Sequence, residues 1–533
     1  MKTVLLFLAA LLAGSSRARA QAPADSSVLR LWHHPDKPFN APGNGNPLLP
    51  GYYADPTIIE DKGTYYIYAT SDLTDWNGIN RMAAWTSTDF VNWQCQYLNW
   101  PTKALCGSST SQTAGVWAPS VVKAPNGKFY MYVSVGEEIW VGVADAPLGP
   151  WRNARPGGGP LIRHKAFWFV ETIDAECFID DDGQAYLYWG SSHSDFDIEG
   201  RCLAVKLKPD MITFDGEPRD VTPPHYFEAP YMLKRNGQYY FSYSWGHTWD
   251  KTYQVRYATG PTPFGPWTEG MMRPILGTNT SDATIFSTGH HTLLRKGADT
   301  YIIYHRFNTV NEYKISAKLR QVAADKLLYN PDGSVQRVVT THVGVGPLGP
   351  VPPRKNLAYR APTTSSGDLD PKTKASYATD ENNGTPWIGK PGPTAWLTVD
   401  LGTAQPVKEV AIYPEYPIYT YQFEVSTSND NRTWTSAGRQ TSTPAVASPL
   451  TVTLPNTKAR YVRVQLMQRT GGPRAGVGLH SKACLKGEAH AEGDLAALLP
   501  PLPIRLRPHL QHQRPALHQV GVRQQRLAQR LPI

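Results

Sequence analysis

Three carboxylic acids, Asp55, Asp174 and Glu228, stand near the beginning of three segments of similar sequence. A pair of carboxyl groups can hydrolyse a glycosidic bond when one is ionised and activates a water molecule while the other is protonated and assists the leaving oxygen. Inversion needs the two groups about 6.5–9.5 Å apart, so that the water fits between them. Because these acids are far apart in the chain, the fold must bring them together.

Five segments of related sequence supply such a fold, and they begin at Asp55, Ala118, Asp174, Glu228 and His290. Each runs through apolar positions, turns at a glycine and leaves as an aromatic-rich strand, a pattern typical of a β-hairpin. The segments start 54 to 63 residues apart, which suits one multi-stranded sheet per repeat. The repeats therefore predict a five-bladed β-propeller, with the first residue of each repeat near one central axis.

The surroundings of the acids suggest a role for each. Glu228 is the candidate general acid, because its apolar neighbours raise the pKa of a carboxyl group. Asp55 is the candidate general base. Asp174 would orient Glu228 and keep it protonated by like-charge repulsion. Glu176, two residues further and on the same face of the strand, is an alternative to Asp174 in that role.

The composition also favours an all-β protein. Of the 533 residues, 11% are aromatic and 18% charged, with 44 glycines and 46 prolines. The net charge of +9 is concentrated in residues 501–533, which carry six arginines and no acid, so the rest of the chain has a net charge of only +3. This distribution gives little support for nucleic-acid binding. We expect residues 488–533 to be disordered or to be the product of a shifted reading frame.

Residues 1–20 read as a cleaved signal peptide: Lys2 is followed by an apolar run and by the cleavage motif Ala18-Arg19-Ala20. We therefore expect a protein that is secreted or periplasmic and not held in a membrane. Cys95 and Cys106 could form a disulfide in such a compartment, whereas Cys177, inside an apolar strand, is expected to be a core residue. The chain has no CxxC or HExxH motif, so a zinc site is not supported.

Between its two ends the chain divides into two folded units. Residues 27–345 hold the five repeats, and residues 346–355 form a linker rich in proline and glycine. Residues 356–487 contain alternating strands, such as 396–400, 421–425 and 460–464, which predict a β-sandwich. The phrases in these residues that resemble a known module imply that it is of the jelly-roll, galactose-binding type.

Over residues 45–345 the chain resembles glycoside hydrolase family 43. The resemblance rests on ADPTII at Ala54, VWAPSV at Val116, IDAECFIDDDGQAYLYWG at Ile173, EAPYMLKRNGQYYFSYS at Glu228 and GHH at Gly289. That family consists of five-bladed propellers that act as inverting arabinofuranosidases, xylosidases, arabinanases and some galactosidases. The resemblance implies the same three roles for Asp55, Asp174 and Glu228.

The resemblance also implies binding residues. His290 matches a histidine through which the family often holds a calcium ion near the axis, although a plain structural histidine fits equally well. Trp117 resembles the aromatic residue that lines the sugar pocket, and Arg306 an arginine that bonds a sugar hydroxyl; a core tryptophan and a surface ion pair are the alternatives. Trp76 and Trp245 are further candidates for stacking on sugar rings. No cofactor is expected beyond a structural Ca²⁺.

Residues 356–487 resemble a coagulation factor 5/8 type C (discoidin-like) module, through ATDENNGTPW at Ala378, AWLTVDLG at Ala395, FEVSTSNDNRTW at Phe423 and RYVRVQL at Arg460. Such modules often bind sugars and hold a structural calcium ion. The closing stretch GLHSKACLKG, from Gly478, departs from the pattern.

The hypothesis favoured by these features is an exported inverting glycosidase that releases arabinofuranosyl or xylosyl residues from plant cell-wall polysaccharides. The alternatives are a β-galactosidase-type member of the same family, a non-catalytic carbohydrate-binding propeller, and a retaining enzyme in which Asp55 is the nucleophile. The segment RMAAWTSTDFVNW at Arg81 departs from the family pattern and leaves the choice of sugar open. The sequence also leaves open whether the enzyme acts in the exo or the endo mode, and what its oligomeric state is.

Overall fold

The computed structural model describes residues 36–72, 80–111, 115–192, 199–270, 274–279, 284–307, 319–353, 355–390, 395–440, 447–470 and 483–487. The predicted signal peptide, the basic tail 488–533 and Trp76 lie outside these ranges. Among the described residues, no helix has both the length and the apolar character needed to cross a membrane.

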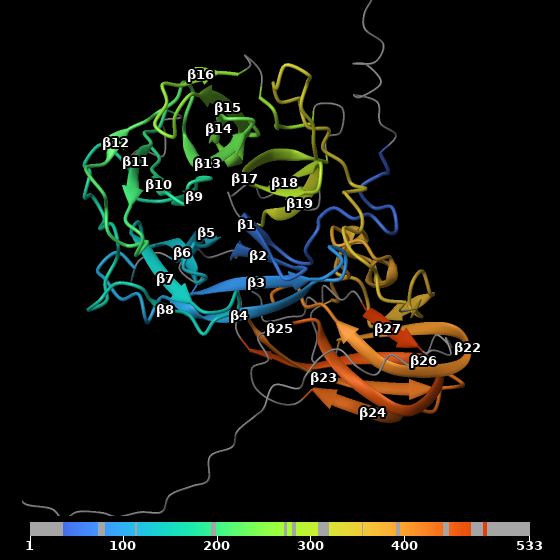
Figure 1. Ribbon diagram of the computed structural model, residues 1–533. Coiled ribbons are helices and arrows are strands. Elements are labelled where there is room, and N and C mark those ends of the chain that lie inside the picture. Colours follow the sequence, from blue (N-terminus) through green and yellow to red (C-terminus); the bar gives the residue numbers. More distant parts are fainter. Residues whose placement is uncertain are drawn as a thin grey trace, which may run out of the picture. The chain divides into compact units, whose positions relative to one another are not determined.

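Five antiparallel sheets surround one axis, as the sequence repeats predict (Figure 1). The blades are β1 (Tyr53–Asp61), β2 (Thr64–Ser71), β3 (Arg81–Ser87) and β4 (Gln94–Thr102); β5 (Val116–Lys123), β6 (Phe129–Val135), β7 (Ile139–Ala144) and β8 (Arg152–Asn153); β9 (Glu176–Ile179), β10 (Ala185–Trp189), β11 (Leu203–Leu207) and β12 (Arg219–Asp220); β13 (Glu228–Arg235), β14 (Gln238–Trp245), β15 (Gln254–Gly260) and β16 (Thr268–Glu269); and β17 (Phe286–Lys296), β18 (Asp299–Phe307) and β19 (Gln321–Leu327). A short 3-10 helix, η2 (Thr248–Asp250), follows β14.

The aromatic-rich second strand of each repeat is apolar on both faces because each face packs against a different neighbouring blade. In β2, Ile67 joins a cluster with Ile303 of the fifth blade, whereas the next residue, Tyr68, joins a cluster with Met131 of the second blade. Successive side chains of a strand point to opposite faces. Three further clusters fill the spaces between the second and third, third and fourth, and fourth and fifth blades, so five cores replace a single one.

The ring is closed by the segment that precedes β1. The fifth blade has three strands, and the Leu48 amide donates to the carbonyl of Val322 on the outer edge of β19 (2.7 Å). The Asn46 side chain accepts from the Ala324 amide and donates to its carbonyl, both at 2.9 Å. Chain segments from the two ends of the propeller domain are thereby joined.

The second domain is the predicted β-sandwich. Its strands are β20 (Lys355–Asn356), β21 (Thr363–Ser365), β22 (Ala395–Ile412), β23 (Thr420–Ser428), β24 (Thr435–Gln440), β26 (Leu450–Thr470) and β27 (Ala483–Gly487), with two 3-10 helices, η4 (Pro371–Thr373) and η5 (Ala375–Thr379). The long strands β22 and β26 pair in three stretches separated by two register shifts; β23 pairs with β26 along the first stretch, and β27 pairs with β22 along the last. Both layers therefore share two strands, and the fully buried Trp387 lies in their common core.

The two domains lie within one compact unit. Strand β25 (Ala447–Ser448) of the sandwich region pairs with β4 at the outer edge of the first blade. The predicted linker also packs on this blade: Leu348 donates its amide to Asp89, and its carbonyl accepts from the Tyr65 hydroxyl, each at 2.9 Å. Leu348 thus fixes this part of the linker to the propeller.

The structure contradicts the predicted disulfide. Cys95 and Cys106 are both buried as free thiols. Cys95 lies in β4, in the core between the first and fifth blades, whereas Cys106 lies in the core between the first and second. The two thiols face different cores, which sequence separation alone does not reveal. Cys177 is a buried core residue, as predicted.

The packing between blades gives a first testable prediction. Gly142 in β7 lies against the ring of Trp100 from the first blade, and a Cβ there would be 2.1 Å from that ring. We expect Gly142→Ala to lower the free energy of unfolding by about 1–3 kcal/mol, since overpacking forces a rigid indole to shift. Urea denaturation measures it. Gly107→Ala is the control, because its Cβ would meet nothing closer than 3.7 Å. Equal effects of the two substitutions would contradict this account of the blade contact.

Candidate active site

Every blade has a residue in the left-handed region of backbone space within the first residues of its inner strand or just before that strand. These residues are Asp55, Ala118, Asp174, Ala229 and His290, with φ values of 51°, 50°, 56°, 54° and 42°. Four of the five inner strands show a register irregularity beside this residue. Such bulges redirect a side chain and are common next to active sites. In these four strands the bulge lies next to Asp55, Ala118, Ala229 and His290 and changes the direction of the side chains there.

This register corrects one feature of the sequence repeat. Asp55 and Asp174 occupy the left-handed position, but in the fourth blade that position belongs to Ala229. Glu228 is one residue earlier, in the register of Trp117 in the second blade. The sequence alignment of the repeats placed Glu228 level with the two aspartates. The longer glutamate side chain stands on a different backbone position.

The amides of the left-handed residues are held by side chains of the neighbouring blades. Ala118, Asp174 and His290 donate to Thr70 Oγ1 (2.9 Å), Ser134 Oγ (3.1 Å) and Ser244 Oγ (3.0 Å), and Asp55 to His305 Nδ1 (3.5 Å). In the third blade the corresponding residue is Gly190, which has no side chain, and the Ala229 amide bonds the carboxylate of Asp174 instead. A Cβ on Gly190 would lie 2.2 Å from the carbonyl of Arg201.

Asp55 is buried, and its carboxylate lies next to one arginine, one threonine and two histidines. Its carboxylate accepts from Arg320 (2.9 Å) and Thr70 (2.9 Å), and it lies 3.2 Å from the Nδ1 atoms of both His290 and His305. Burial by itself would raise the pKa of Asp55, but the charge of Arg320 and the two histidines outweigh it and hold that pKa well below its usual range. Asp55 is therefore ionised throughout the physiological pH range.

Arg320 is the cation that makes this possible. It precedes β19, is buried, and bonds Asp72 through its backbone amide (2.6 Å), Nε (3.0 Å) and a terminal nitrogen (3.1 Å). Burial lowers the pKa of Arg320, but Asp55 and Asp72 raise it further still. Burial lowers the pKa of both His290 and His305, the latter to about 4, so both imidazoles are neutral at pH 7. The permanent positive charge beside Asp55 belongs to Arg320.

Glu228 has the opposite environment. Burial raises its pKa to about 7, although the hydrogen bond from the Tyr253 hydroxyl (2.6 Å) opposes the shift and the Asp55 charge adds to it. Ser191 donates to the other carboxyl oxygen at 3.3 Å. The Tyr253 ring stacks on His305, with 5.4 Å between ring centroids, and packs so closely on Gly289 that a Cβ there would be 2.2 Å away. The glycine of the GHH motif makes room for this tyrosine.

Asp174 completes a pair of interacting carboxyl groups. Burial, Glu228 and Asp55 all raise the pKa of Asp174 well above its usual value. Two buried carboxyl groups in mutual repulsion do not both ionise at neutral pH. The Asp174–Glu228 pair therefore retains a proton under conditions in which Asp55 has none. One site thus contains an ionised base and a protonated acid.

Glu176, the predicted alternative to Asp174, has different contacts from Asp174. It lies further along β9, and its carboxyl accepts from Ser120 of the second blade (2.7 Å). Burial raises the pKa of Glu176 to about 8. Burial and the charges of Glu228 and Asp55 raise the pKa of Asp174, whereas burial accounts for the raised pKa of Glu176. These contacts favour Asp174 over Glu176 as the partner of Glu228.

Two of the other predicted binding residues lie in accessible places. Trp117 is half-buried at the beginning of β5, in the same register as Glu228, which is compatible with a place beside the axis. Trp245 is half-buried at the end of β14; its indole N–H donates to Glu199 (3.2 Å) and its ring contacts His225. A sugar contact by either residue stays a prediction.

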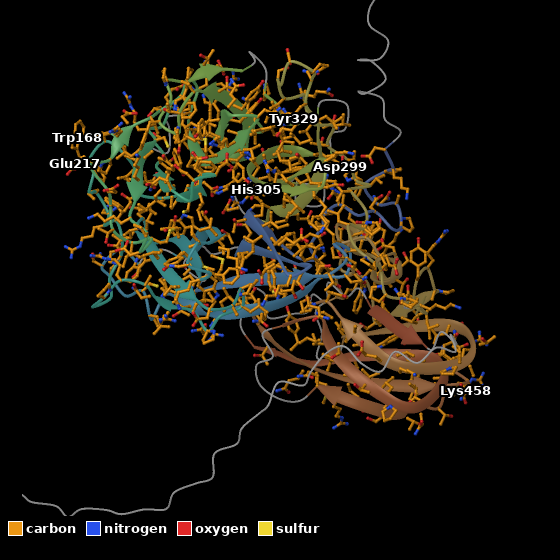
Figure 2. All side chains as sticks on the ribbon, viewed as in Figure 1. Trp168, Glu217, Asp299, His305, Tyr329 and Lys458 are labelled. Carbon is orange, nitrogen blue, oxygen red and sulfur yellow. The ribbon has the colours of Figure 1, made fainter. Side chains whose placement is uncertain are left out.

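The structure corrects the prediction that Arg306 binds a sugar hydroxyl. It has no exposed surface, and its guanidinium donates to the carbonyl of Thr341 (2.8 Å) and contacts His342 Nδ1 (3.1 Å). Its neighbour His305 faces Asp55, near the middle of the ring of blades (Figure 2). Because adjacent residues of a strand point to opposite faces, Arg306 points away from the site.

Sequence reasoning missed Arg320, Tyr253, His305 and Asp72. Asp72 carries a weak signal, because it directly follows a strand whose end lies near the axis. Arg320 and Tyr253 directly precede β19 and β15, the third strands of their blades, and belong to no repeated motif. Two buried aspartates need a cation beside them, so a buried basic residue could be expected. The sequence does not say which arginine it is.

His290 was also a candidate metal ligand. Its Nδ1 lies 3.2 Å from Asp55 and 3.7 Å from Asp174. Within the described ranges, no group of three or more histidine, cysteine, aspartate or glutamate side chains could hold a metal ion. A calcium ion at His290 stays a prediction, and no step below is routed through it.

Comparison with known proteins identifies the class to which this site belongs. Residues 44–335 match the model of glycosyl hydrolases family 43, and residues 362–479 match the F5/8 type C domain. The chain belongs to glycosyl hydrolases family 43, and it is a glycosidase that hydrolyses O-glycosyl bonds.

Two relatives and one solved structure illustrate the similarity. A beta-D-galactofuranosidase of Aspergillus niger is 34% identical over 317 residues, which cover 56% of this chain and 86% of the relative. An arabinoxylan arabinofuranohydrolase of Bacillus subtilis is 31% identical over 341 residues, covering 57% of this chain and 66% of that relative. A solved structure described as a glycoside hydrolase has a TM-score of 0.67 at 28% identity, covering 83% of this chain and 98% of its own.

The buried charge cluster yields a second prediction. We expect Arg320→Met to destabilise the protein by about 3–5 kcal/mol at pH 7, because it leaves Asp55 and Asp72 buried without their cation. The depressed pKa of Asp55 stabilises the wild type above the unfolded value of about 4, and this stabilisation is lost as the pH falls through the folded value. The deficit of the variant should therefore shrink below about pH 4. Urea unfolding across pH measures it.

Lys326→Met is the matched control. Lys326 forms an ion pair with Asp299 in which both side chains are about half exposed, so we expect no measurable loss of stability. A deficit for Arg320→Met that stays constant down to pH 2 would contradict the assigned role of Asp55.

Proposed function

We propose that this protein is an inverting glycosidase that releases arabinofuranosyl or xylosyl residues from arabinoxylan and related plant polysaccharides. The observation that carries the proposal is the contrast between neighbouring carboxyl groups. Asp55 is held ionised by Arg320, whereas Glu228, repelled by charge and buried, has a pKa of about 7. An inverting mechanism needs these two protonation states at once.

In the proposed reaction a water molecule attacks the anomeric carbon from the side opposite the leaving group. Asp55 takes one proton from this water, and Glu228 gives its proton to the glycosidic oxygen as the carbon–oxygen bond breaks. Both carboxyl groups then return to their starting states by exchanging protons with solvent. Asp174 is a positioning residue: the amide of Ala229, the residue after Glu228, holds the Asp174 carboxyl group, and the Asp174–Glu228 pair retains the proton that the reaction needs.

The relatives favour a furanose sugar. One is named a beta-D-galactofuranosidase and two are named arabinoxylan arabinofuranohydrolases. The ring of a β-D-galactofuranoside has the configuration of an α-L-arabinofuranoside and differs by a longer exocyclic chain, so one pocket can accept both. A galactofuranosidase is therefore the second candidate. Xylosyl release is favoured by relatives named xylosidase/arabinosidase, which are 27–28% identical.

A substrate panel tests the proposal. The panel consists of three aryl glycosides: an α-L-arabinofuranoside, a β-D-xyloside and a β-D-galactofuranoside. We expect one of them to be hydrolysed with inversion, and NMR identifies the anomer that forms first. Glu228→Gln should reduce kcat at least 100-fold, an estimate from the contribution of general acid catalysis, about 10²–10⁴. Asp55→Asn should do the same.

Glu176→Gln is the matched control, since this buried carboxyl lies on the same strand as Asp174 but bonds Ser120. It should leave kcat within a few-fold of wild type. Retention of configuration would replace the inverting mechanism by the retaining one. Sugar binding without turnover would favour the carbohydrate-binding alternative.

The pH dependence is a separate prediction. A general acid must be protonated, so kcat/KM should fall as the pH rises through about 7, the pKa of Glu228. Tyr253→Phe removes a hydrogen bond that lowers this pKa, so the alkaline limb should move to higher pH. Tyr257→Phe, in the same blade but bonded to the Val335 amide, should leave the limb in place. A shift to lower pH for Tyr253→Phe would show that this hydroxyl stabilises the protonated acid instead.

Three further features of the proposal rest on sequence alone. Export rests on residues 1–20, sugar binding by the second domain rests on its resemblance to discoidin-like modules, and structural calcium rests on the family resemblance.

A further inference from the structure

We propose that the sandwich domain is a working part of the active site: through Tyr416 it positions Asp72 and Arg320, and through them Asp55. The inference rests on the proposed function, because it assigns Asp55 to the reaction. Its basis is a set of contacts between loop 413–419 of the sandwich and two short segments of the propeller. One segment leads into Asp55, and the other leads into Arg320.

The first contact is between two tyrosine rings. Tyr416 of the sandwich packs on Tyr52, three residues before Asp55, with 5.8 Å between ring centroids, and both side chains are buried. Leu319, the residue immediately before Arg320, packs against the same two rings together with Ile418 and Tyr419. Leu319 has a left-handed backbone (φ 71°), a conformation that a branched side chain adopts only when its surroundings impose it. The sandwich loop supplies those surroundings.

The next step leads from Tyr52 to the charged cluster. The carbonyl of Tyr52 accepts from the Asp72 amide (3.0 Å). The carboxylate of Asp72 in turn accepts three bonds from Arg320, and Arg320 donates to Asp55 at 2.9 Å. A displacement of Tyr52 or Leu319 therefore moves both residues that fix the guanidinium. Since Arg320 keeps Asp55 ionised, the effect reaches the general base.

A second route joins the same points. The Tyr97 hydroxyl, on β4, lies 3.0 Å from the Ser71 hydroxyl, next to Asp72. Tyr421 of the sandwich is near enough to raise the pKa of Tyr97, and its hydroxyl accepts from the Tyr416 amide (3.4 Å). Gly51, just before Tyr52, has φ 93°, and a Cβ there would lie 2.9 Å from the Glu415 carbonyl. The close approach of the two backbones at Gly51 shows that this interface is tightly packed.

The test uses the full chain and three variants. We expect Tyr416→Ala to lower kcat by about tenfold to a hundredfold, the range for a small misplacement of a reacting group. The acidic limb of kcat/KM should move to higher pH, because a loosened Arg320 lets the pKa of Asp55 rise. KM should change by less than about twofold, since Tyr416 acts through other residues. Tyr416→Phe keeps the ring and should restore both kcat and the pH profile.

Asn383→Ala is the matched control. Asn383 also joins the sandwich to the propeller, donating to the carbonyls of Pro47 (3.1 Å) and Leu48 (2.9 Å), but it lies off the route to Asp55. It should leave the acidic limb unchanged. The inference is overturned if Tyr416→Ala alters KM alone, if it alters nothing, or if Asn383→Ala shifts the limb equally.

A double-mutant cycle makes the test independent of turnover. The effects of Tyr416→Ala and Asp72→Asn on the urea midpoint should be non-additive, because the two residues belong to one contact chain. Additive effects would overturn the inference. If the wild type hydrolyses no aryl glycoside, the proposed function fails while this cycle still decides whether the sandwich and the charge cluster are coupled.

Discussion

The structure depends above all on the ion pair between Asp55 and Arg320. A buried carboxylate is costly unless a partner charge and hydrogen bonds compensate it, and here Arg320, Thr70 and two neutral histidines do so. Asp72 in turn holds the guanidinium in place. Without this cation the three acids at the axis would share their protons, and none would be reliably ionised. With it, one carboxyl group is ionised and the Asp174–Glu228 pair keeps a proton.

The five-fold repeat supplies the second constraint. Each blade has a left-handed residue at or near the beginning of its inner strand whose amide is bonded across a blade boundary, so the same local arrangement recurs in all five blades. The arrangement is modified only where chemistry requires it. At Gly190 the side chain is missing, and the Ala229 amide bonds Asp174 instead. The repeat therefore gives a rigid ring, and its single exception gives the acid pair a defined orientation.

The sandwich domain extends the same principle beyond the propeller. The family 43 match covers the propeller, which also carries the three acids, yet the segments that carry Asp55 and Arg320 are packed from outside by loop 413–419. A displacement of about 1 Å in Arg320 would change both the ionisation of Asp55 and its position, so packing that holds these segments supports the site. The charge cluster and the domain interface are thus linked by neighbouring backbone segments.

The sequence by itself determined the number of blades, the sandwich, the family resemblance and the acids Asp55, Asp174 and Glu228, because these are carried by periodic apolar patterns and by motifs within single segments. Only the tertiary structure decided which arginine faces Asp55, that Glu228 stands one residue off the repeat register, and that Cys95 and Cys106 face different cores. The physical reason is that a bulge or a strand's alternation sets the direction of a side chain. Contacts between residues as distant as Asp55 and Arg320 leave no local pattern, since each is satisfied by a partner from another blade.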